Sequence, residues 1–266
     1  MTNIGFIGTG NMGGALAVAA SKNSNNEIFL CNRHTAKAIA VSDLTGGRTV
    51  TNAEEIAKVS KYIFLGVKPQ NISDLLSSLS LPLSSRKDRF IIVSMAAGTP
   101  IQKIHTLLGF ECPVIRIMPN IPVKAGEGMI LYSCSPDVNH GEETEFLSAM
   151  KYAGRFIKLE ENLIDAGSAV SGCGPAFAAM FVEALADGGV ACGLPRKQAV
   201  ELASQMVLGT AKMILDEDIH PGTLKDAVCS PGGTTIQGVL ALEDGAFRSA
   251  VAGAVISAYE KTISLK

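Results

Sequence analysis

The sequence predicts an α/β domain followed by an all-α domain, and two observations indicate this division. From the start of the chain to about residue 160, short β-rich runs alternate with helical or loop stretches, which is typical of a mostly parallel sheet with crossover helices. After that point the β-rich runs stop, and long stretches rich in Ala, Met and Leu have a helical pattern. We therefore predict an α/β domain over 1–160 and an α-helical domain over 161–266.

Seven β-rich runs in the first part of the chain are the predicted strands. Each is short and almost continuously apolar, as expected for strands that are buried on both faces of a sheet. Their residues are 3–8, 27–31, 62–67, 90–95, 114–118, 128–132 and 155–159. Two helix starts are predicted between them. Thr51 and Glu54 have the spacing of a capping box, and Thr99 followed by Pro100 suits an N-cap and a first helical residue.

Two long helices are predicted in the second part of the chain, over 174–195 and 195–215, followed by shorter helices over 221–266. Gly193 and Pro195 mark the join between the long helices. Small residues on these helices permit close helix packing. They include Ala178, Ala179, Gly188 and Gly189. Such packing occurs either against a partner subunit or within the chain, and the sequence leaves both alternatives open.

The composition excludes several classes of protein. The 266 residues are 47% hydrophobic and 18% charged, as in soluble globular proteins, and the formal net charge of −2 argues against nucleic-acid binding. The six cysteines form no CxxC pair and the four histidines are scattered, so no metal site is expected. Isolated thiols indicate a reducing compartment, and neither a signal peptide nor an uninterrupted apolar span is apparent. We therefore expect a cytoplasmic protein that binds no membrane.

A glycine-rich turn follows the first predicted strand. Gly8, Gly10 and Gly13 form a G-x-G-x-x-G pattern, and residues 15–20 read as the helix that follows it. In this context Gly8 permits the tight turn and Gly10 permits the close approach of a pyrophosphate, while Gly13 lets the helix pack against the strand. The turn predicts a Rossmann-type dinucleotide-binding domain.

The end of the second predicted strand distinguishes between the two nicotinamide cofactors. Cys31, Asn32 and Arg33 lie where NAD-preferring sites usually have an acidic residue. An acidic side chain repels the 2′-phosphate of NADP(H), whereas an arginine pairs with it through two hydrogen bonds. We therefore expect NADPH as the cofactor, with NADH used at lower preference. The alternative is that Arg33 is an ordinary solvated surface residue.

Three further strand ends are expected at the same crevice, because ligands of open α/β sheets bind beyond the carboxyl ends of the strands. They are 67–69, 95–98 and 118–120. The small residues over 96–98 leave space for a nicotinamide ring. Lys68 is either a cofactor contact or a lysine whose apolar stem covers the strand end while its amine reaches solvent.

A second glycine-rich turn, CSPGGTTIQG at 229–238, precedes a predicted helix. Gly232 and Gly233 leave backbone amides uncovered by side chains, and Thr234 and Thr235 add hydroxyl groups just before the helix. Such a turn suits one carboxylate at a helix N-terminus. The alternative is a purely structural corner. Because the first turn already accounts for a pyrophosphate, we predict that the second holds the carboxylate of a substrate.

Seven motifs together resemble the pyrroline-5-carboxylate reductase family. They are GFIGTGNMG, GVKPQ, SMAAG, RIMPNIP, SGCGPAF, EALADGGVACGLPR and LKDAVCSPGGTTIQGVLALE, and the resemblance extends from residue 3 to residue 262. It implies reduction of 1-pyrroline-5-carboxylate to L-proline with NAD(P)H, the last step of proline biosynthesis. It also implies self-association through the helical domain, as a dimer or a ring of dimers.

The resemblance assigns site residues by motif position. The cofactor contacts that it implies are Ile7, Gly8, Thr9, Gly10, Asn11, Met12, Asn32, Arg33, Val67, Lys68, Pro69, Ala96 and Ala97. The glycine pattern adds Gly13 to the predicted cofactor site. The substrate contacts that it implies are Asp218, Ser230, Gly232, Gly233, Thr234 and Thr235. For Asp218 and its neighbour Glu217 the alternative is that both are solvated surface residues.

Thr235 is the predicted catalytic residue. The substrate is a cyclic imine with one carboxylate, and its protonated form is already a good electrophile, so no strong side-chain acid is required. Orientation of the imine carbon next to the nicotinamide then supplies most of the catalysis. We expect Thr235 to hydrogen-bond to the ring nitrogen, where it either orients that atom or relays a proton. The alternative for this hydroxyl is a helix N-cap.

Three other functions fit parts of the sequence. A β-hydroxyacid dehydrogenase shares the opening motif, but in the resembling families it needs a lysine on the first long helix. Here no lysine follows Ser171 until Lys197, which lies in the next helix. Another kind of imine reductase is the second alternative. The third is a non-catalytic NADP(H)-binding protein, which does not need the second glycine turn that this chain retains.

Overall fold

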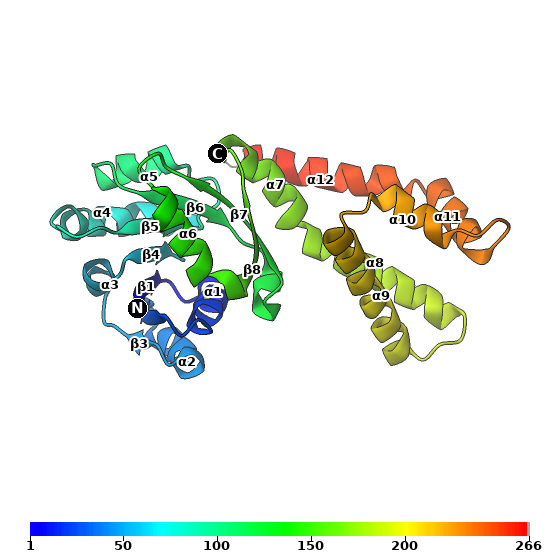
Figure 1. Cartoon of the computed structure of the whole chain (residues 1–266), viewed down its shortest axis with the longest axis horizontal. Helices are drawn as coiled ribbons and strands as arrows, with labels where there is room; N and C mark the ends of the chain where they lie inside the picture. Colours follow the sequence, from blue (N-terminus) through cyan, green and yellow to red (C-terminus); the bar gives the residue numbers. More distant parts are fainter. Residues whose placement is uncertain (265–266) are drawn as a thin grey trace. The chain divides into compact units, whose positions relative to one another are not determined.

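A computed structural model describes residues 1–264 of the chain (Figure 1). Internal contacts divide the chain into two compact units. Among the described residues, the first is an α/β unit of Met1–Gly172 together with 259–264, and the second is a helical unit of Cys173–Ala258. The predicted domain boundary at residue 160 was placed where the β-rich runs end, whereas these two units are defined by their internal contacts. The predicted boundary therefore stays a prediction.

One eight-stranded sheet forms the centre of the α/β unit. Its strand order is β3-β2-β1-β4-β5-β6-β7-β8, and all neighbours are parallel except β6 and β7. The strands are β1 (Thr2–Ile7), β2 (Asn26–Cys31), β3 (Arg48–Thr49), β4 (Tyr62–Leu65), β5 (Ile91–Ser94), β6 (Val114–Met118), β7 (Gly128–Cys134) and β8 (Gly154–Lys158). All seven predicted strands are present, so the predicted α/β class is confirmed.

The sequence does not predict β3. This strand has only two residues, Arg48 and Thr49, and both are exposed. It pairs with β2 at one edge of the sheet, where Phe29 is in register with Arg48. A polar dipeptide carries no apolar periodicity, and therefore no sequence pattern indicates this strand.

Helices cover both faces of the sheet (Figure 1). They are α1 (Asn11–Ser21), α2 (Thr35–Thr45), α3 (Ala53–Val59), α4 (Ile72–Ser84), α5 (Ile101–Leu108), α6 (His140–Ala149) and α7 (Ile164–Ser171), with 3₁₀ segments η1 (Pro69–Asn71), η2 (Ile121–Ala125), η3 (Lys151–Ala153) and η4 (Glu161–Leu163). One face packs on α1 and α6 through a buried cluster that includes Phe6, Leu16 and Phe146. The other face packs on α3, α4 and α5 through a cluster that includes Ile63 and Leu76.

The start of α3 differs from the prediction. Its N-cap is Asn52, whose side chain accepts a hydrogen bond at 2.9 Å from the backbone N–H of Glu55. The predicted capping box of Thr51 and Glu54 is therefore wrong by one residue. Thr51 instead donates its hydroxyl hydrogen to the Glu55 carboxylate. Asn and Thr are both favoured at N-caps, so residue type alone does not choose between adjacent positions.

The start of α5 is also displaced from the prediction. Pro100 is the N-cap and the helix begins at Ile101, so the predicted N-cap at Thr99 is wrong. The backbone N–H of Ile101 donates to the carboxylate of Glu161 at 2.8 Å. Thr99 is buried, and its hydroxyl points to the carbonyl of Ala97. A side chain 60 positions away in the sequence therefore performs the capping, which local spacing does not indicate.

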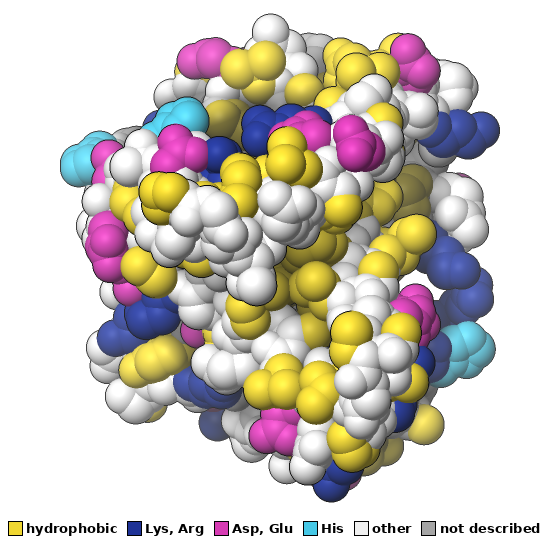
Figure 2. All heavy atoms as spheres, turned by 90° about the vertical axis from the view of Figure 1, so that its right-hand side faces the viewer, with side chains coloured by type: hydrophobic (Ala, Val, Ile, Leu, Met, Phe, Trp, Pro, Cys, Tyr) yellow, Lys and Arg dark blue, Asp and Glu magenta, His cyan; other side chains and the backbone are white. Residues whose placement is uncertain are grey.

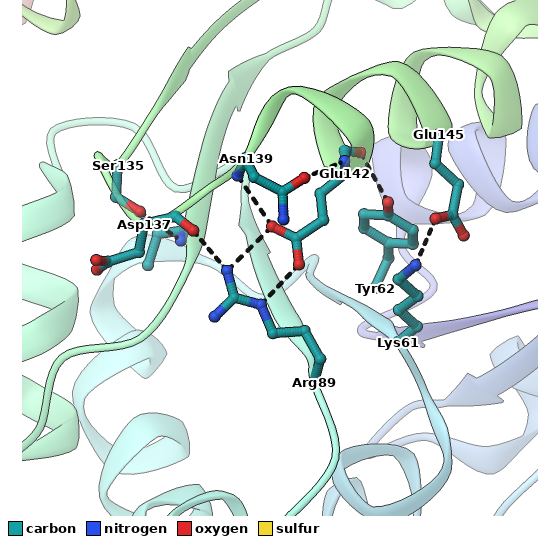
Figure 3. Close-up of polar contacts among 9 residues, drawn as sticks. Lys61, Tyr62, Arg89, Ser135, Asp137, Asn139, Glu142 and Glu145 are labelled. Carbon is teal, nitrogen blue, oxygen red and sulfur yellow. Dashed lines mark hydrogen bonds and ion pairs between the residues drawn. The ribbon is translucent and has the colours of Figure 1, made fainter.

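A polar network fastens α6 to the amino ends of β4 and β5 (Figure 3). Arg89 donates to both carboxylate oxygens of Glu142, at 2.6 and 3.0 Å, and Asn139 and Glu142 form a capping box at the start of α6. Tyr62 donates its hydroxyl hydrogen to the Glu142 carbonyl at 2.8 Å. The hydrogen bonds from Arg89 are the largest influence that holds the pKa of Glu142 below its usual range. The network lies at the edge opposite the carboxyl ends of these strands, and it supports the fold.

Five helices form the helical unit. They are α8 (Gly174–Ala191), α9 (Arg196–Glu217), α10 (Pro221–Val228), α11 (Thr234–Asp244) and most of α12 (Phe247–Ser264). A short loop joins α8 to α9, and in it Gly193 has a φ of +98°, a left-handed conformation that glycine adopts at little cost. Asp187 of α8 pairs with Arg196 of α9 next to this loop. The two long helices predicted from the sequence are confirmed.

The helical unit exposes a large apolar surface. Figure 2 shows hydrophobic side chains gathered over it. Met180 of α8 and Leu202 of α9 are 68% and 59% exposed. An apolar hollow of about 600 Å³ lies between α8, α11 and α12, and its lining includes Phe177, Phe181, Leu242, Phe247 and Val251. Contiguous exposed apolar surface is a mark of an interaction site.

The small residues of α8 contribute to this exposed surface. Ala178, Ala179 and Gly188 are exposed, whereas a Cβ added to Gly189 would contact Leu194 and Ala199. Packing within the chain therefore accounts for Gly189 and not for the other three. Of the two alternatives left open by the sequence, this exposure favours packing against a partner subunit.

One apolar segment, Glu161–Ala191, is long and apolar enough to cross a membrane by length and hydropathy alone. This finding differs from the expectation that the apolar segments are too interrupted. Only 11% of its most apolar 18-residue window is buried within the chain. The segment is not one regular helix, because Gly172 and Cys173 adopt a turn between α7 and α8. The exposed apolar residues of α8 belong to the surface described above.

Candidate active site

The first glycine turn connects β1 to α1 at the carboxyl edge of the sheet. Gly8 has a φ of +101°, which residues with a side chain rarely adopt, and a Cβ there would lie 2.6 Å from the backbone of Gly66. A Cβ on Gly13 would lie closer than 3.0 Å to the carbonyl oxygen of Gly8, whereas a Cβ on Gly10 would meet nothing within 4 Å. The turn is therefore closely packed on its protein side and open at Gly10.

The N-terminus of α1 is arranged to bind an anion. Gly10 is the N-cap, no side chain caps the helix, and the first turn contains no acidic residue. The first backbone N–H groups of an α-helix have no partner within the helix, and they carry a partial positive charge. The open space at Gly10 gives a pyrophosphate access to these groups, so the geometry fits the predicted dinucleotide.

Asn32 connects this turn to the end of β2. Its Nδ2 donates to the hydroxyl of Thr9 at 3.1 Å, and its Oδ1 accepts from the backbone N–H of His34 at 3.0 Å. Burial raises the pKa of the Cys31 thiol, with a smaller contribution from a glutamate, so this thiol stays neutral at physiological pH. Arg33 is exposed just before the start of α2, where its guanidinium is accessible to a ligand.

The ends of β4 and β5 supply the other predicted cofactor residues. Val67 is half-buried, and Lys68 and Pro69 are exposed at the start of η1. Ala96 is buried, whereas Ala97 is exposed on the loop between β5 and α5. The exposure of Lys68 leaves both alternatives for this residue open, since a solvated amine can also reach a bound phosphate.

All the predicted cofactor residues lie at one edge of one sheet. The strands β1, β2, β4 and β5 are parallel neighbours, so the segments 7–13, 32–33, 67–69 and 96–97 follow the same ends of adjacent strands. Sequence reasoning missed Gly66, whose N–H donates to the carbonyl of Ile7 at 2.8 Å and whose backbone supports Gly8. A glycine at the end of an apolar strand was the available signal for such a close backbone approach.

The second glycine turn lies in the helical unit, between α10 and α11. Gly232 has a φ of +67°, and the N–H of Gly233 donates to the carbonyl of Ser230 at 3.0 Å. Gly233 is the N-cap of α11, which has no side-chain cap, and Thr234 and Thr235 are the first two helical residues. The alternative of an N-cap at Thr235 is therefore wrong. Both threonines are exposed, which leaves their hydroxyl groups accessible.

Asp218 terminates α9 on the approach to α10. It has a φ of +50°, a left-handed conformation that is uncommon for a residue with a side chain. Asp218 is exposed, as is its neighbour Glu217. The side chain of His220, two residues later, accepts a hydrogen bond at 3.1 Å from the N–H of Gly222 and caps α10. The assignment of Asp218 as a substrate contact therefore rests on its motif position.

The fold and the first glycine turn define the class of protein. A mostly parallel sheet that carries this turn, an uncapped helix N-terminus and a basic residue after β2 is characteristic of dinucleotide-dependent oxidoreductases. Comparison with protein families agrees. Residues 3–98 match a model described as NADP oxidoreductase coenzyme F420-dependent, and residues 161–265 match a model described as pyrroline-5-carboxylate reductase dimerisation.

Similarity to individual proteins identifies the family. The chain is 38% identical over 265 residues to pyrroline-5-carboxylate reductase of Escherichia coli strain K12, covering 98% of this chain and 97% of that protein. The solved structure of a pyrroline-5-carboxylate reductase from Coxiella burnetii is 30% identical, with a TM-score of 0.92 and coverage of 100% and 98%. That of Plasmodium falciparum pyrroline carboxylate reductase with NADP bound is 30% identical, with a TM-score of 0.84 and coverage of 98% and 97%. The chain belongs to the pyrroline-5-carboxylate reductase family.

Proposed function

We propose that this protein reduces 1-pyrroline-5-carboxylate to L-proline with NADPH, the last step of proline biosynthesis. The observation that carries the proposal is the second glycine turn, which lies within the matched dimerisation model and leaves the N-terminus of α11 uncapped. Such a helix start, with exposed threonines, suits the single carboxylate of this substrate. The reaction consumes the imine, NADPH and one proton, and it yields proline and NADP⁺.

The proposed cofactor site is the carboxyl edge of the sheet. The uncapped N-terminus of α1 and the open space at Gly10 support binding of the pyrophosphate by residues 7–13. The exposed guanidinium of Arg33 supports a preference for NADPH over NADH, because it can form two charge-assisted hydrogen bonds with a 2′-phosphate. The other proposed contacts are Asn32, 67–69 and 96–97. When bound there, NADPH supplies the hydride.

The second glycine turn is the proposed substrate site. Residues 232–234 and Ser230 are expected to hold the carboxylate through backbone amides and hydroxyl groups. The hydroxyl of Thr235 is not used as a helix cap, and we expect it to hydrogen-bond to the ring nitrogen, which gains a proton as the imine carbon gains the hydride. Holding the ring at both its carboxylate and its nitrogen restricts its orientation, which is the main requirement for this reaction. Asp218 is a further proposed contact.

Self-association through the helical domain at 161–266 is part of the proposal, as a dimer or a ring of dimers. The exposed apolar side chains of α8 and α9 and the apolar hollow next to α8 support it, because a second copy of the chain would remove them from water. The isolated thiols of the six cysteines support a cytoplasmic location.

The experiment that tests the proposed function is a cofactor oxidation assay. Purified protein should oxidise NADPH when 1-pyrroline-5-carboxylate is added, and should leave NADPH unchanged without it. Two further arms replace the imine by a β-hydroxyacid with NADP⁺, or by a cyclic imine that lacks the carboxylate. Absence of turnover with 1-pyrroline-5-carboxylate, or turnover of the β-hydroxyacid instead, would contradict the proposal.

The role of Thr235 is tested by two substitutions of similar size. Thr235→Val removes the hydroxyl and keeps the shape, and we expect kcat to fall by about tenfold to a thousandfold because the hydrogen bond to the ring nitrogen is lost. Thr235→Ser should retain most of the activity. Thr106→Val removes a hydroxyl that bonds only within α5, and it is the matched control. Equal kcat values for Thr235→Val and the control would contradict the assigned role.

A further inference from the structure

The loop between β5 and α5 carries the residues that are expected to face the nicotinamide. It comprises residues 95–100. A hydrogen bond of 3.3 Å from the backbone N–H of Thr99 to the carbonyl of Ala96 closes its turn. Ala97 is exposed, and a Cβ added to Gly98 would meet no atom within 4 Å. The outer side of the loop therefore leaves room for a planar ring.

Glu161 holds the end of this loop. Ile101 is the first residue of α5, and its backbone N–H donates to the carboxylate of Glu161 at 2.8 Å. Pro100, the N-cap, has no side-chain acceptor, so this carboxylate satisfies a backbone N–H that the helix itself leaves without a partner. A carboxylate at this position also interacts favourably with the positive end of the helix. The two residues are 60 positions apart in the sequence, and both lie in the α/β unit.

Arg116 holds the carboxylate of Glu161 from the sheet. Its Nη1 lies 3.4 Å from the Glu161 carboxylate, and its Nη2 lies 3.1 Å from that of Asp165. Arg116 is in β6, in register with Ser94, which is the last residue of β5 and the residue from which the loop departs. The same part of the sheet therefore fixes the start of the loop through β5 and its end through Arg116 and Glu161.

Neutralisation of Arg116 does not by itself explain Glu161. Asp165 is 2% exposed and lies closer to the guanidinium, so it already supplies the opposite charge that a buried arginine needs. The side chain of Glu161 is 31% exposed, and its contact with the N–H of Ile101 is shorter than its contact with Arg116. Glu161 is therefore better explained by the start of α5 than by the charge of Arg116.

We propose that Glu161 is a positioning residue for the nicotinamide half of the cofactor, which rests on the proposed function and its cofactor site. By capping α5, it keeps residues 96–98 in the conformation that receives the ring. Without the cap, this conformation is populated for only part of the time, and the apparent affinity falls by that fraction. Loss of a charged cap changes such an equilibrium by about fivefold to tenfold. The adenosine half of the cofactor is unaffected, because its proposed contacts at 7–13 and 32–33 follow other strands.

The test uses two ligands and needs no substrate turnover. NADPH contains the nicotinamide, whereas 2′-phospho-ADP-ribose contains the rest of the cofactor without it. Their Kd values are measured by isothermal titration calorimetry for the unaltered protein, Glu161→Ala and Glu161→Gln. Asn139→Ala is the matched control, because Asn139 also caps a helix of this unit by accepting from a backbone N–H, but at the opposite edge of the sheet.

We expect Glu161→Ala to raise the Kd of NADPH by about fivefold to tenfold and to leave the Kd of 2′-phospho-ADP-ribose within about 1.5-fold of its original value. Glu161→Gln should keep the Kd of NADPH within about twofold, because its amide oxygen still accepts from the N–H of Ile101. Asn139→Ala should leave both Kd values unchanged, even if its unfolding temperature falls as much as that of Glu161→Ala.

Two results would overturn the inference. One is an equal rise of both Kd values in Glu161→Ala, which would mean that Glu161 supports the whole cofactor site rather than its nicotinamide half. The other is a Kd of NADPH for Glu161→Ala that equals that of the unaltered protein. The proposed function fails separately: an unaltered protein that binds NADPH but reduces no imine refutes the function and leaves this inference in place, whereas one that binds neither ligand refutes both.

Discussion

Substitution of Gly10 by alanine separates cofactor binding from folding. Gly10 has a φ of −74° and a ψ of −165°, which alanine adopts without strain, and an added Cβ would meet no atom within 4 Å. We therefore expect the free energy of unfolding to stay within about 0.5 kcal/mol of its original value or to rise slightly, because alanine loses less conformational entropy on folding. The methyl group would instead occupy the space through which a pyrophosphate reaches the N-terminus of α1.

The magnitude of the binding defect follows from the hydrogen bonds that the methyl group would block. A hydrogen bond from a backbone N–H to a charged group contributes about 1.5–3 kcal/mol. Loss of one such bond in Gly10→Ala corresponds to an increase of about tenfold to a hundredfold in the Kd for NADPH. NADH should be affected to the same extent, because both cofactors share the pyrophosphate.

Gly13→Ala is the contrasting variant. Its Cβ would lie closer than 3.0 Å to the carbonyl oxygen of Gly8, so the backbone of the turn or of α1 has to move. Such overpacking costs about 1–3 kcal/mol, and it is offset only in part by the better helix propensity of alanine. Gly13→Ala should therefore unfold at a lower temperature and also lose cofactor affinity.

The assay measures thermal unfolding of the proteins without cofactor, together with the Kd values for NADPH and NADH. For Gly10→Ala we expect an unchanged unfolding temperature and weaker binding, and for Gly13→Ala we expect both defects. The reasoning is refuted if Gly10→Ala binds NADPH as tightly as the unaltered protein, since the pyrophosphate would then not approach through this space. It is also refuted if Gly10→Ala and Gly13→Ala destabilise the fold equally.

Two further predictions concern charged residues. Arg33→Ala should raise the KM for NADPH by about tenfold or more and leave the KM for NADH almost unchanged, because only NADPH has the 2′-phosphate, and equal effects in the oxidation assay would refute this role. Arg89→Met should destabilise the protein by about 1–2 kcal/mol at pH 7, where Glu142 is ionised. Because the pKa of Glu142 is lower in the folded protein than in the unfolded chain, this stabilisation is present above pH 4.5 and is lost as the pH falls through the pKa of the folded state. In urea unfolding, the difference in the free energy of unfolding between Arg89→Met and the unaltered protein should therefore shrink at low pH. If this difference in the free energy of unfolding does not change with pH, the ion pair between Arg89 and Glu142 is not the source of the stabilisation.

The sheet and the first glycine turn could be predicted because their signals are local. Each buried strand is a continuous apolar run, such as Val114–Met118, whose bounds agree with the prediction. The turn at Gly8 depends on a backbone conformation that glycine favours, and its function depends on the helix that follows directly. In both cases the residues that determine the structure lie within a few positions of one another.

The starts of α3 and α5 could not be predicted exactly from local sequence patterns. The choice between Thr51 and Asn52 as the cap of α3 concerns two adjacent residues of similar capping preference, and sequence spacing alone gives the wrong one. At α5 the deciding contact comes from Glu161, 60 positions away, which accepts the hydrogen bond that a local cap would otherwise accept. A pattern that extends over four residues contains no information about such a partner.

In the candidate site too, some features follow from local sequence, whereas others depend on residues that are distant in the sequence. Residue type indicates that glycine and threonine at 232–235 suit a carboxylate, and the start of α11 at Thr234 leaves the hydroxyl of Thr235 without a capping role. For Asn120 the sequence predicts only that it follows a strand whose end lies at the crevice. The structure gives that amide two backbone partners, Met129 and Ser171, which lie 9 and 51 positions away. These two hydrogen bonds hold the start of β7 and the end of α7 to the end of β6 within the α/β unit, and no local pattern of residues in the sequence indicates partners at such separations.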